Sequence, residues 1–493
     1  MVFQNNVLAG ASNVTGEVIP DQYLINQSIR FNNTGSNGTS HYFSRTPSSA
    51  GNQKTWTLSW WMKVGVGSDR RSLFSRRVGS AGAAAFRIRL LEDSSGNASQ
   101  IDFYMGNGSS VDAQTFSYKF RDPSAWYHCV VTFDTTNVSV EDRLKFTVNG
   151  VRQTDTTAYA NLDYDTNYVW NSANEHNIGR QVVDNDNWMD GYMAEIVFID
   201  GTAHEATSFG EYNSKGIWIP KNIYNQSFTF GTNGFYLTGQ NADYLGYDYQ
   251  TSDRSGTTND WTANNFNAHD KVADSPTNNF CVMNPNNNSG SGTLSQGNLR
   301  YAGASTGNNV AGTIGMSSDK WYWELYIEDD NQVYPGVQDS NVLASGYTEK
   351  AVGVETGDNG DIHEDDANSG LDSVDPNTGD IVGIAFDATN KKIWWSLNGV
   401  WYRADQSTTA VINVSEVEAG NQGYNLSSRT PDFFMPFIGN YTHGTAIINF
   451  GQEGTFAGAT TAGGNSDGNG IGNFKYSVPS GYLALCTKNL GES

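Results

Sequence analysis

The chain has 493 residues, which is enough for two or more hydrophobic cores of ordinary domain size. Its 29 Lys and Arg against 52 Asp and Glu give a formal net charge of −23, which argues against DNA or RNA as a partner, because such binding needs cations at the phosphates. Aromatic residues make up 13% and charged residues only 16%, with 53 Gly, a composition typical of an all-β protein with many turns.

Residues 1–27 lack the basic and apolar regions of a secretory signal, and no apolar run approaches the roughly 20 residues of a membrane span. We therefore expect an N-terminal arm in a protein that is made in a cytoplasm and is not inserted into a membrane. The cysteines Cys129, Cys281 and Cys486 are odd in number and widely spaced. This pattern predicts buried free thiols, and neither a disulfide framework nor a zinc site.

From residue 28 onward, short segments alternate apolar and polar residues and predict half-buried strands. They include 55–63, 85–90, 101–104, 126–134, 144–148, 177–180 and 192–201. Asn149 and Gly150 directly follow one of them and are the strongest short-range signal for a β-hairpin. The block ends near residue 225.

Four of these segments, WYHCVVTFD, LKFTVNGV, NIGR and DGYMAEIVFIDG, stand in the order found in laminin-G-like, concanavalin A-like jelly rolls. Residues 28–225 resemble that family. The resemblance implies a β-sandwich of two packed antiparallel sheets.

Residues 226–289 are rich in Asn, Asp and Gly, with only isolated strand-like pieces, and predict an irregular connector. Aromatic residues such as Phe235, Trp261 and Phe280 supply apolar area that disordered linkers lack. We therefore expect the connector to be ordered.

A second strand-rich block covers residues 290–455. Its series WYWELYI, GDIVGIAFD, IWWSLNGVWY, FFMPFIG and AIINFGQ resembles a SPRY domain, a β-sandwich that generally serves as a binding module. Asn398 and Gly399 predict another hairpin within it. The fold class we expect is thus all-β, with two consecutive antiparallel β-sandwiches and a C-terminal arm over 456–493.

The opening MVFQNNVLAG, the block FSRTPSSAGNQKTWTLSWWMK, the segment DSPTNNF and the ending PSGYLALCTKNL together resemble structural proteins of marine bacteriophages, which are commonly tail-fibre-like. The resemblance implies a virion component, in a tail fibre or as a decoration of the head. Its partners would be other virion proteins and a host-surface glycan or receptor, and it would assemble as a homo-oligomer.

Jelly rolls also host glycanases, which need two carboxylates about 5 to 9 Å apart. Glu195 stands alone on its predicted strand, and Asp200, five residues on, should point to the opposite face.

Residues 303–307 match the pattern GxSxG, but without the strand and helix that a hydrolase elbow requires. We expect no catalysis. A depolymerase whose carboxylate pair comes from separate strands, and a purely structural capsid-stabilising protein, are the alternatives.

Two acidic loops could bind calcium, which needs six to eight oxygen ligands. Asp184, Asp186 and Asp190 lie in the first loop, and Asp358 and Asp361 in the second. A calcium site at the first three residues is one interpretation, and a solvated acidic loop is the other.

Aromatic residues on loops are candidates for stacking on sugar rings. Trp188 lies in the first acidic loop, and Trp401 directly follows a hairpin turn. In SPRY domains the binding face is formed by loops at one end of the sandwich. That resemblance adds Tyr334, Tyr347 and the loop 358–366, with Asp358 and Asp361, as candidate ligand-binding residues.

Overall fold

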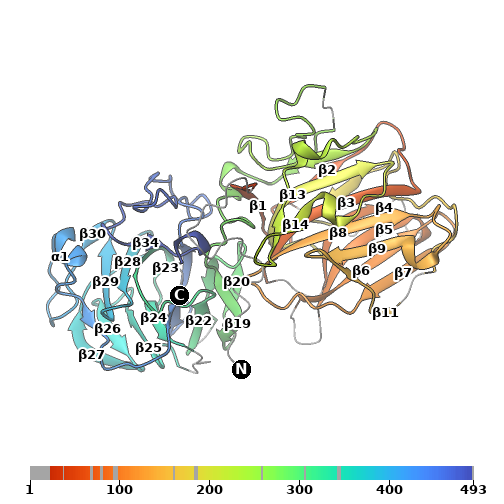
Figure 1. Ribbon diagram of the computed structural model, residues 1–493. Coiled ribbons are helices and arrows are strands. Elements are labelled where there is room, and N and C mark those ends of the chain that lie inside the picture. Colours follow the sequence, from red (N-terminus) through yellow and green to blue (C-terminus); the bar gives the residue numbers. More distant parts are fainter. Residues whose placement is uncertain are drawn as a thin grey trace. The chain divides into compact units, whose positions relative to one another are not determined.

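The computed structural model describes residues 23–490, except for residues 37, 67–69, 78–81, 93–97, 159–160, 182–186, 257–258, 305–306 and 341–345. The described chain is all-β and forms two compact units that divide after Asn278 (Figure 1). Each unit contains two large sheets of almost entirely antiparallel strands, which confirms the predicted fold class. Within the described ranges, no helix is long and apolar enough to cross a membrane.

The N-terminal unit contains two eight-stranded sheets, A and B. Sheet A has the order β10 (Val151–Gln153), β9 (Leu144–Val148), β8 (Trp126–Asp134), β3 (Thr55–Val64), β13 (Gly191–Asp200), β1 (Ser28–Phe31) and β18 (Lys271–Val272), with β16 (Phe235–Leu237) paired to β13. Sheet B has the order β11 (Thr156–Ala158), β7 (Val111–Phe116), β6 (Ala98–Gly106), β5 (Ala85–Glu92), β4 (Arg70–Arg77), β12 (His176–Ile178), β2 (Tyr42–Arg45) and β17 (Thr262–Asn264). A separate ribbon pairs β14 (Gly210–Tyr212) with β15 (Trp218–Pro220).

The main core of this unit follows from the period-two pattern of its strands. Trp56, Leu58, Trp60 and Met62 alternate along β3, are fully buried, and belong to one apolar cluster with side chains from both sheets. Phe86 of β5 contributes to the same cluster from sheet B. Residues i, i+2 and i+4 of one strand therefore form the sandwich core, as the alternation predicts.

The opposite face of sheet A is also covered. A second apolar cluster contains Trp61 of β3 and Val197 of β13 together with Phe209, Trp218 and Tyr236 from the chain that follows β13. All five side chains are at least nine-tenths buried. The chain after residue 205 therefore covers the face of sheet A that points away from the core.

The segment predicted as a connector, residues 226–289, is divided between the two units. β16, β17 and β18 extend sheets A and B, whereas β19 (Met283–Ser289) belongs to the second unit. Phe235 and Trp261 are 2% and 1% exposed in the N-terminal core. The segment therefore differs from the predicted connector. The physical reason is that its apolar side chains gain free energy by being buried in the core of the N-terminal sandwich.

The C-terminal unit contains sheets C and D and one short helix, α1 (Val414–Glu418). Sheet C has the order β19, β22 (Asn308–Gly312), β32 (Phe434–Asn440), β24 (Val333–Asp339), β25 (Ala351–Val354), β26 (Asp361–Glu364) and β27 (Ala367–Asp372). Sheet D has the order β20 (Thr293–Ser295), β21 (Arg300–Ala302), β33 (Thr445–Asn449), β23 (Lys320–Asp329), β28 (Ile381–Asp387), β29 (Lys392–Leu397) and β30 (Val400–Trp401), with β31 (Tyr424–Asn425) paired to β29 and β34 (Leu483–Ala484) paired to β23.

The predicted C-terminal arm, residues 456–493, forms part of this unit. β34 pairs with β23 in parallel. The buried carboxylate of Glu324 on β23 accepts the backbone N–H groups of Lys475 and Tyr476 at 2.8 Å each. These bonds attach the final segment to the centre of sheet D, so it completes the sandwich rather than extending from it.

Both predicted hairpins are confirmed. The turn between β9 and β10 has φ of 46° at Asn149 and 79° at Gly150, and the turn between β29 and β30 has 50° at Asn398 and 82° at Gly399. Two successive left-handed residues match the right-handed twist of the flanking strands, which is why Asn-Gly is favoured there. The three cysteines are buried free thiols, as predicted.

Candidate binding sites

Three aromatic residues that we predicted to bind a ligand are buried. Trp188, Trp401 and Tyr334 are only 7%, 5% and 1% exposed. The ring centroids of Trp401 and Tyr322 are 6.3 Å apart. The prediction of exposed indoles at Trp188 and Trp401 is wrong, because a large apolar ring near the end of a strand gains more from packing inward than from exposure.

The first predicted calcium site lies only partly within the described chain. Asp184 and Asp186 are outside the described residues, so calcium at that loop stays a prediction. Asp190 is 2% exposed, and its carboxylate accepts the backbone N–H of Asn33 at 3.3 Å. Asp190 therefore links two loops within the N-terminal unit.

Sheet C brings several predicted residues together in what we call the tyrosine–histidine cluster, formed by Tyr334 of β24, His363 of β26, Tyr347 and Tyr441. The ring centroids of Tyr347 and Tyr441 are 5.0 Å apart in an edge-on arrangement, and that of Tyr334 is 4.8 Å from Tyr347 and 5.0 Å from His363. Tyr334 forms the buried base, Tyr347 is half-buried and Tyr441 is 40% exposed. The cluster thus presents aromatic surface to solvent above a rigid base.

A buried carboxylate holds the base of this cluster in place. Glu355 accepts hydrogen bonds from Gln332 at 2.7 Å and from the Tyr334 hydroxyl at 2.9 Å, and its other oxygen lies 3.1 Å from His363 Nε2. Burial acts to raise the pKa of Glu355, but the hydrogen bonds from His363, Tyr334 and Gln332 prevail and hold it below its ordinary value. His363 Nδ1 lies 3.2 Å from the Tyr347 hydroxyl.

Glu355, Asp361 and His363 are the residues of this region that could hold a metal. One ligand atom from each lies within 4.8 Å of the others. Two carboxylates and an imidazole match zinc or manganese better than calcium, because calcium takes six to eight oxygens. Of the predicted residues, Asp361 lies in this set, whereas Asp358 lies in the exposed turn before it.

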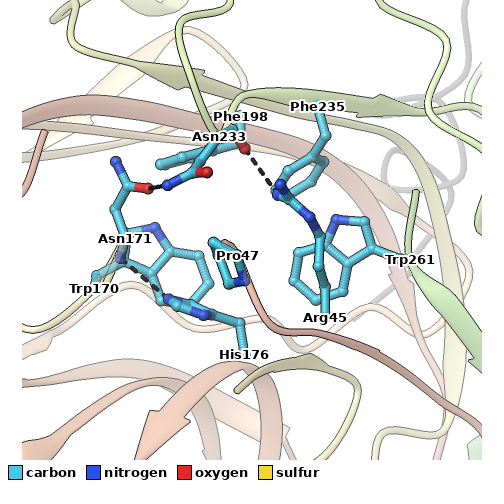
Figure 2. Close-up of a pocket in the computed structure, with 9 residues that line it drawn as sticks. All are labelled: Arg45, Pro47, Trp170, Asn171, His176, Phe198, Asn233, Phe235 and Trp261. Carbon is cyan, nitrogen blue, oxygen red and sulfur yellow. Dashed lines mark hydrogen bonds between the residues drawn. The ribbon is translucent and has the colours of Figure 1, made fainter. Parts of the chain in front are cut away.

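A small cavity lies in the N-terminal unit, where several strands of the sandwich begin or end (Figure 2). Its volume is about 10 Å³, roughly enough for one water molecule. Figure 2 shows Trp170 and His176 on one side and Arg45 and Trp261 on the other. The remaining lining residues are Pro47, Asn171, Phe198, Asn233 and Phe235. Sequence analysis did not select any of these residues as part of a site.

Hydrogen bonds connect the polar residues around this cavity. Arg45 Nη1 donates to the carbonyl oxygen of Asn233 at 3.1 Å, and the Asn233 side chain donates to Asn171 Oδ1 at 2.9 Å. The backbone N–H of Asn171 donates to His176 Nε2 at 3.1 Å. Burial lowers the pKa of Arg45 to about 10 and that of His176 to about 3, so the guanidinium is charged and the imidazole neutral at pH 7.

Glu195 and Asp200, the two acids of β13, are not brought together. Glu195 lies at a β-bulge with φ of 49°, is 5% exposed, and accepts hydrogen bonds from the Tyr23 and Tyr236 hydroxyls. Burial raises the pKa of Glu195 to about 7. Asp200 instead accepts the backbone N–H of Asn52 at 2.7 Å. No second carboxylate contributes to the pKa of Glu195 within the described chain.

Ser59 and His128 form another buried pair on the outer face of sheet A, with Ser59 Oγ 2.9 Å from His128 Nε2. Trp218 Nε1 donates to His128 Nδ1 at 2.9 Å, so the proton of the neutral imidazole lies on Nε2 and is donated to Ser59. Burial lowers the pKa of His128 to about 3. In this tautomer the histidine cannot take a proton from the serine, so the pair lacks the arrangement of an activated nucleophile.

Residues 37–207 match the family model described as the concanavalin A-like lectin/glucanases superfamily. The match lies within the N-terminal unit and confirms the jelly-roll resemblance of that part of the chain. No curated protein matches the sequence.

Similar solved structures have low sequence identity. The SPRY domain of human HERC1 is 14% identical, with 34% of this chain and 96% of that chain covered and a TM-score of 0.26. A SAP-like pentraxin from Limulus polyphemus is also 14% identical, with coverages of 39% and 80% and a TM-score of 0.28. The enzymatically active domain of tailspike protein 2 from bacteriophage CBA120 is 11% identical, with coverages of 34% and 25% and a TM-score of 0.27.

Proposed function

We propose that the protein is a surface component of a bacteriophage virion, in a tail fibre or a head decoration, and that it binds host-surface glycans without cleaving them. The phage setting rests on the resemblance of four segments, two at the ends of the chain and two within it, to structural proteins of marine bacteriophages. The match of residues 37–207 to a superfamily that includes lectins supports a glycan as the ligand.

The observation that carries the proposal is the tyrosine–histidine cluster of the C-terminal unit. A sugar offers an apolar C–H face and a rim of hydroxyl groups, so it fits a site with aromatic surface and a few fixed polar groups. Tyr441 and Tyr347 supply the surface, and Asp361 lies on β26 with His363 as an acceptor for hydroxyl groups. Because Tyr334 and Glu355 are buried and hydrogen-bonded, little order has to be imposed on the site when a ligand binds.

Two features of the N-terminal unit support binding without cleavage. The face of sheet A that points away from the core is covered by Phe209, Trp218 and neighbouring side chains, which leaves no open sheet face there for a polysaccharide. The buried acid of that face, Glu195, is hydrogen-bonded to two tyrosines, whereas glycoside hydrolysis uses a pair of carboxylates.

The test is to incubate the purified protein with host-surface polysaccharide and to follow both its retention and the formation of new reducing ends. We expect retention without new reducing ends, and a loss of retention in Tyr441→Ala and Tyr347→Ala. Tyr212→Ala is the matched control, since Tyr212 is 52% exposed and lies in the other unit. Steady release of reducing ends would favour a depolymerase, and no retention at all would favour a capsid-stabilising role.

A further inference from the structure

Buried cations in this acidic chain usually have a carboxylate partner. Ion pairs in which both side chains are at most one-tenth exposed join Arg30 to Asp270, Lys63 to Asp274 and Arg89 to Asp102. Arg45 and Arg76 differ, because no carboxylate of the described chain lies within ion-pair distance of either guanidinium.

The two guanidinium groups belong to one row across sheet B. His176 of β12 lies opposite Arg45 of β2 on one side and opposite Arg76 of β4 on the other. Residues directly opposite on neighbouring strands share a face of the sheet, so the three side chains lie side by side. The charges of Arg76 and Arg45 both act to lower the pKa of His176, which agrees with this proximity.

Among the residues that the structure describes, both arginines donate hydrogen bonds only to neutral acceptors. Arg76 donates to Ser172 Oγ at 2.8 Å, to the carbonyl oxygen of Ala84 and to Asn174 Oδ1, each at 2.5 Å. Arg45 donates to the Asn233 carbonyl oxygen and to Asn259 Oδ1.

Burial lowers the pKa of both side chains. For Arg45 the attraction of Asp248, Asp260 and Asp200 opposes that effect only in part. A buried charge without a direct counter-ion is costly, so the row favours binding of an anion.

The cavity beside Arg45 adds two more donors. Trp170 and Trp261, each 1% exposed, line it, and neither indole N–H has a hydrogen-bond partner within the described chain (Figure 2). The cavity has a volume of about 10 Å³, roughly that of one water molecule, so it can admit a single oxygen atom but not a whole sugar ring. Arg45 itself is only partly buried, so part of its side chain is in contact with solvent.

We propose that this row and cavity bind the carboxylate of an acidic glycan, such as a uronate-containing polysaccharide. One carboxylate oxygen enters the cavity and the guanidinium of Arg45 forms charge-assisted hydrogen bonds to the group. Arg76 of β4, which is separated from β2 by β12, adds electrostatic attraction for the carboxylate. This inference rests on the proposed glycan-binding function and specifies the class of glycan.

The first test is an NMR titration of the whole wild-type protein with glucuronate and, separately, with glucose. The indole N–H signals of Trp170 and Trp261 are assigned by Trp170→Phe and Trp261→Phe. We expect both signals to move with glucuronate and not with glucose. Movement with both sugars, or with neither, would overturn a site for carboxylates. This measurement needs no variant at the arginines and is therefore independent of any folding defect.

The second test compares the binding of alginate and of neutral dextran by Arg45→Gln, Arg76→Gln and Arg152→Gln. Arg152 is the control, because its side chain is exposed and paired with Asp142 and its replacement removes the same charge from the same unit. We expect Arg45→Gln to lose about tenfold to a hundredfold in alginate affinity, as for one charged hydrogen bond, with a smaller loss for Arg76→Gln and none for Arg152→Gln.

The outcomes separate this inference from the proposed function. Alginate binding that survives both Arg45→Gln and Arg76→Gln but is lost in Tyr441→Ala refutes the carboxylate site and keeps glycan binding. Failure to bind any polysaccharide, with unmoved indole signals, refutes both.

Discussion

The buried acid Glu195 makes the stability of the N-terminal unit depend on pH. Its pKa is raised from an ordinary value of 4.5 to about 7 by burial, so the folded state holds this proton more tightly than the unfolded state does. The stabilisation is complete below pH 4.5 and is lost as the pH rises through 7. At 1.36 kcal/mol per pKa unit, the free energy of unfolding falls by about 3 kcal/mol over this range.

Replacing Glu195 by Gln removes the titrating proton but keeps an oxygen that can accept the hydrogen bonds of Tyr23 and Tyr236. We expect Glu195→Gln to match the wild type near pH 4.5 and to exceed its free energy of unfolding by about 3 kcal/mol at pH 8.

The measurement is urea unfolding of both proteins between pH 4.5 and 8, followed by the fluorescence of the tryptophans. Other groups titrate in this range, so the informative quantity is the difference between variant and wild type at each pH. Glu211→Gln is the control, since its side chain is 55% exposed in the same unit. A difference that stays constant with pH, or that shrinks toward pH 8, would refute the reasoning.

Three further outcomes are expected. Asp102→Asn leaves the 8%-exposed Arg89 without its two hydrogen bonds to a carboxylate, and it should lower the free energy of unfolding by about 3 to 5 kcal/mol in the same assay. Trp188→Ala should destabilise the fold by a similar amount because the ring is buried. Calcium at the loop of Asp184, Asp186 and Asp190 should raise the melting temperature at millimolar concentration and a chelator should reverse the rise, whereas an equal rise in Asp184→Ala/Asp186→Ala would contradict the site.

The elements that follow from local patterns were predictable from the sequence. The alternation along 55–63 and the two Asn-Gly turns gave the central strand of sheet A and both hairpins, because neighbouring residues alone determine them. The boundary at residues 226–289 was not predictable in this way. Its short strands β16 and β17 are stabilised by long-range pairing with β13 and β2, which no local window contains.

Some residues of the candidate sites were likewise predictable from the sequence, and others were not. Tyr334, Tyr347 and the loop 358–366, which contains Asp361 and His363, were proposed from the resemblance to SPRY domains. Glu355 was missed, although it directly follows the strand AVGV, because its role depends on a hydrogen bond from Tyr334 of the neighbouring strand β24, 21 residues earlier in the chain. Arg45 and His176 are 131 residues apart in the sequence, and Arg76 lies between them in the chain. Only the strand order of sheet B places the three residues side by side.

The two proposed sites make different contacts, one with the apolar face of a sugar and one with a carboxylate, and an acidic polysaccharide long enough to join them would engage both. Linked binding of this kind raises avidity by about 10² to 10⁴ over either site alone. If one polymer engages both sites, Tyr441→Ala and Arg45→Gln should each lower retention on long alginate by that factor. On a short oligosaccharide that reaches only one site, each variant should lose only its own contact. Retention on the long polymer that falls by no more than about half in each variant would mean that the sites act independently.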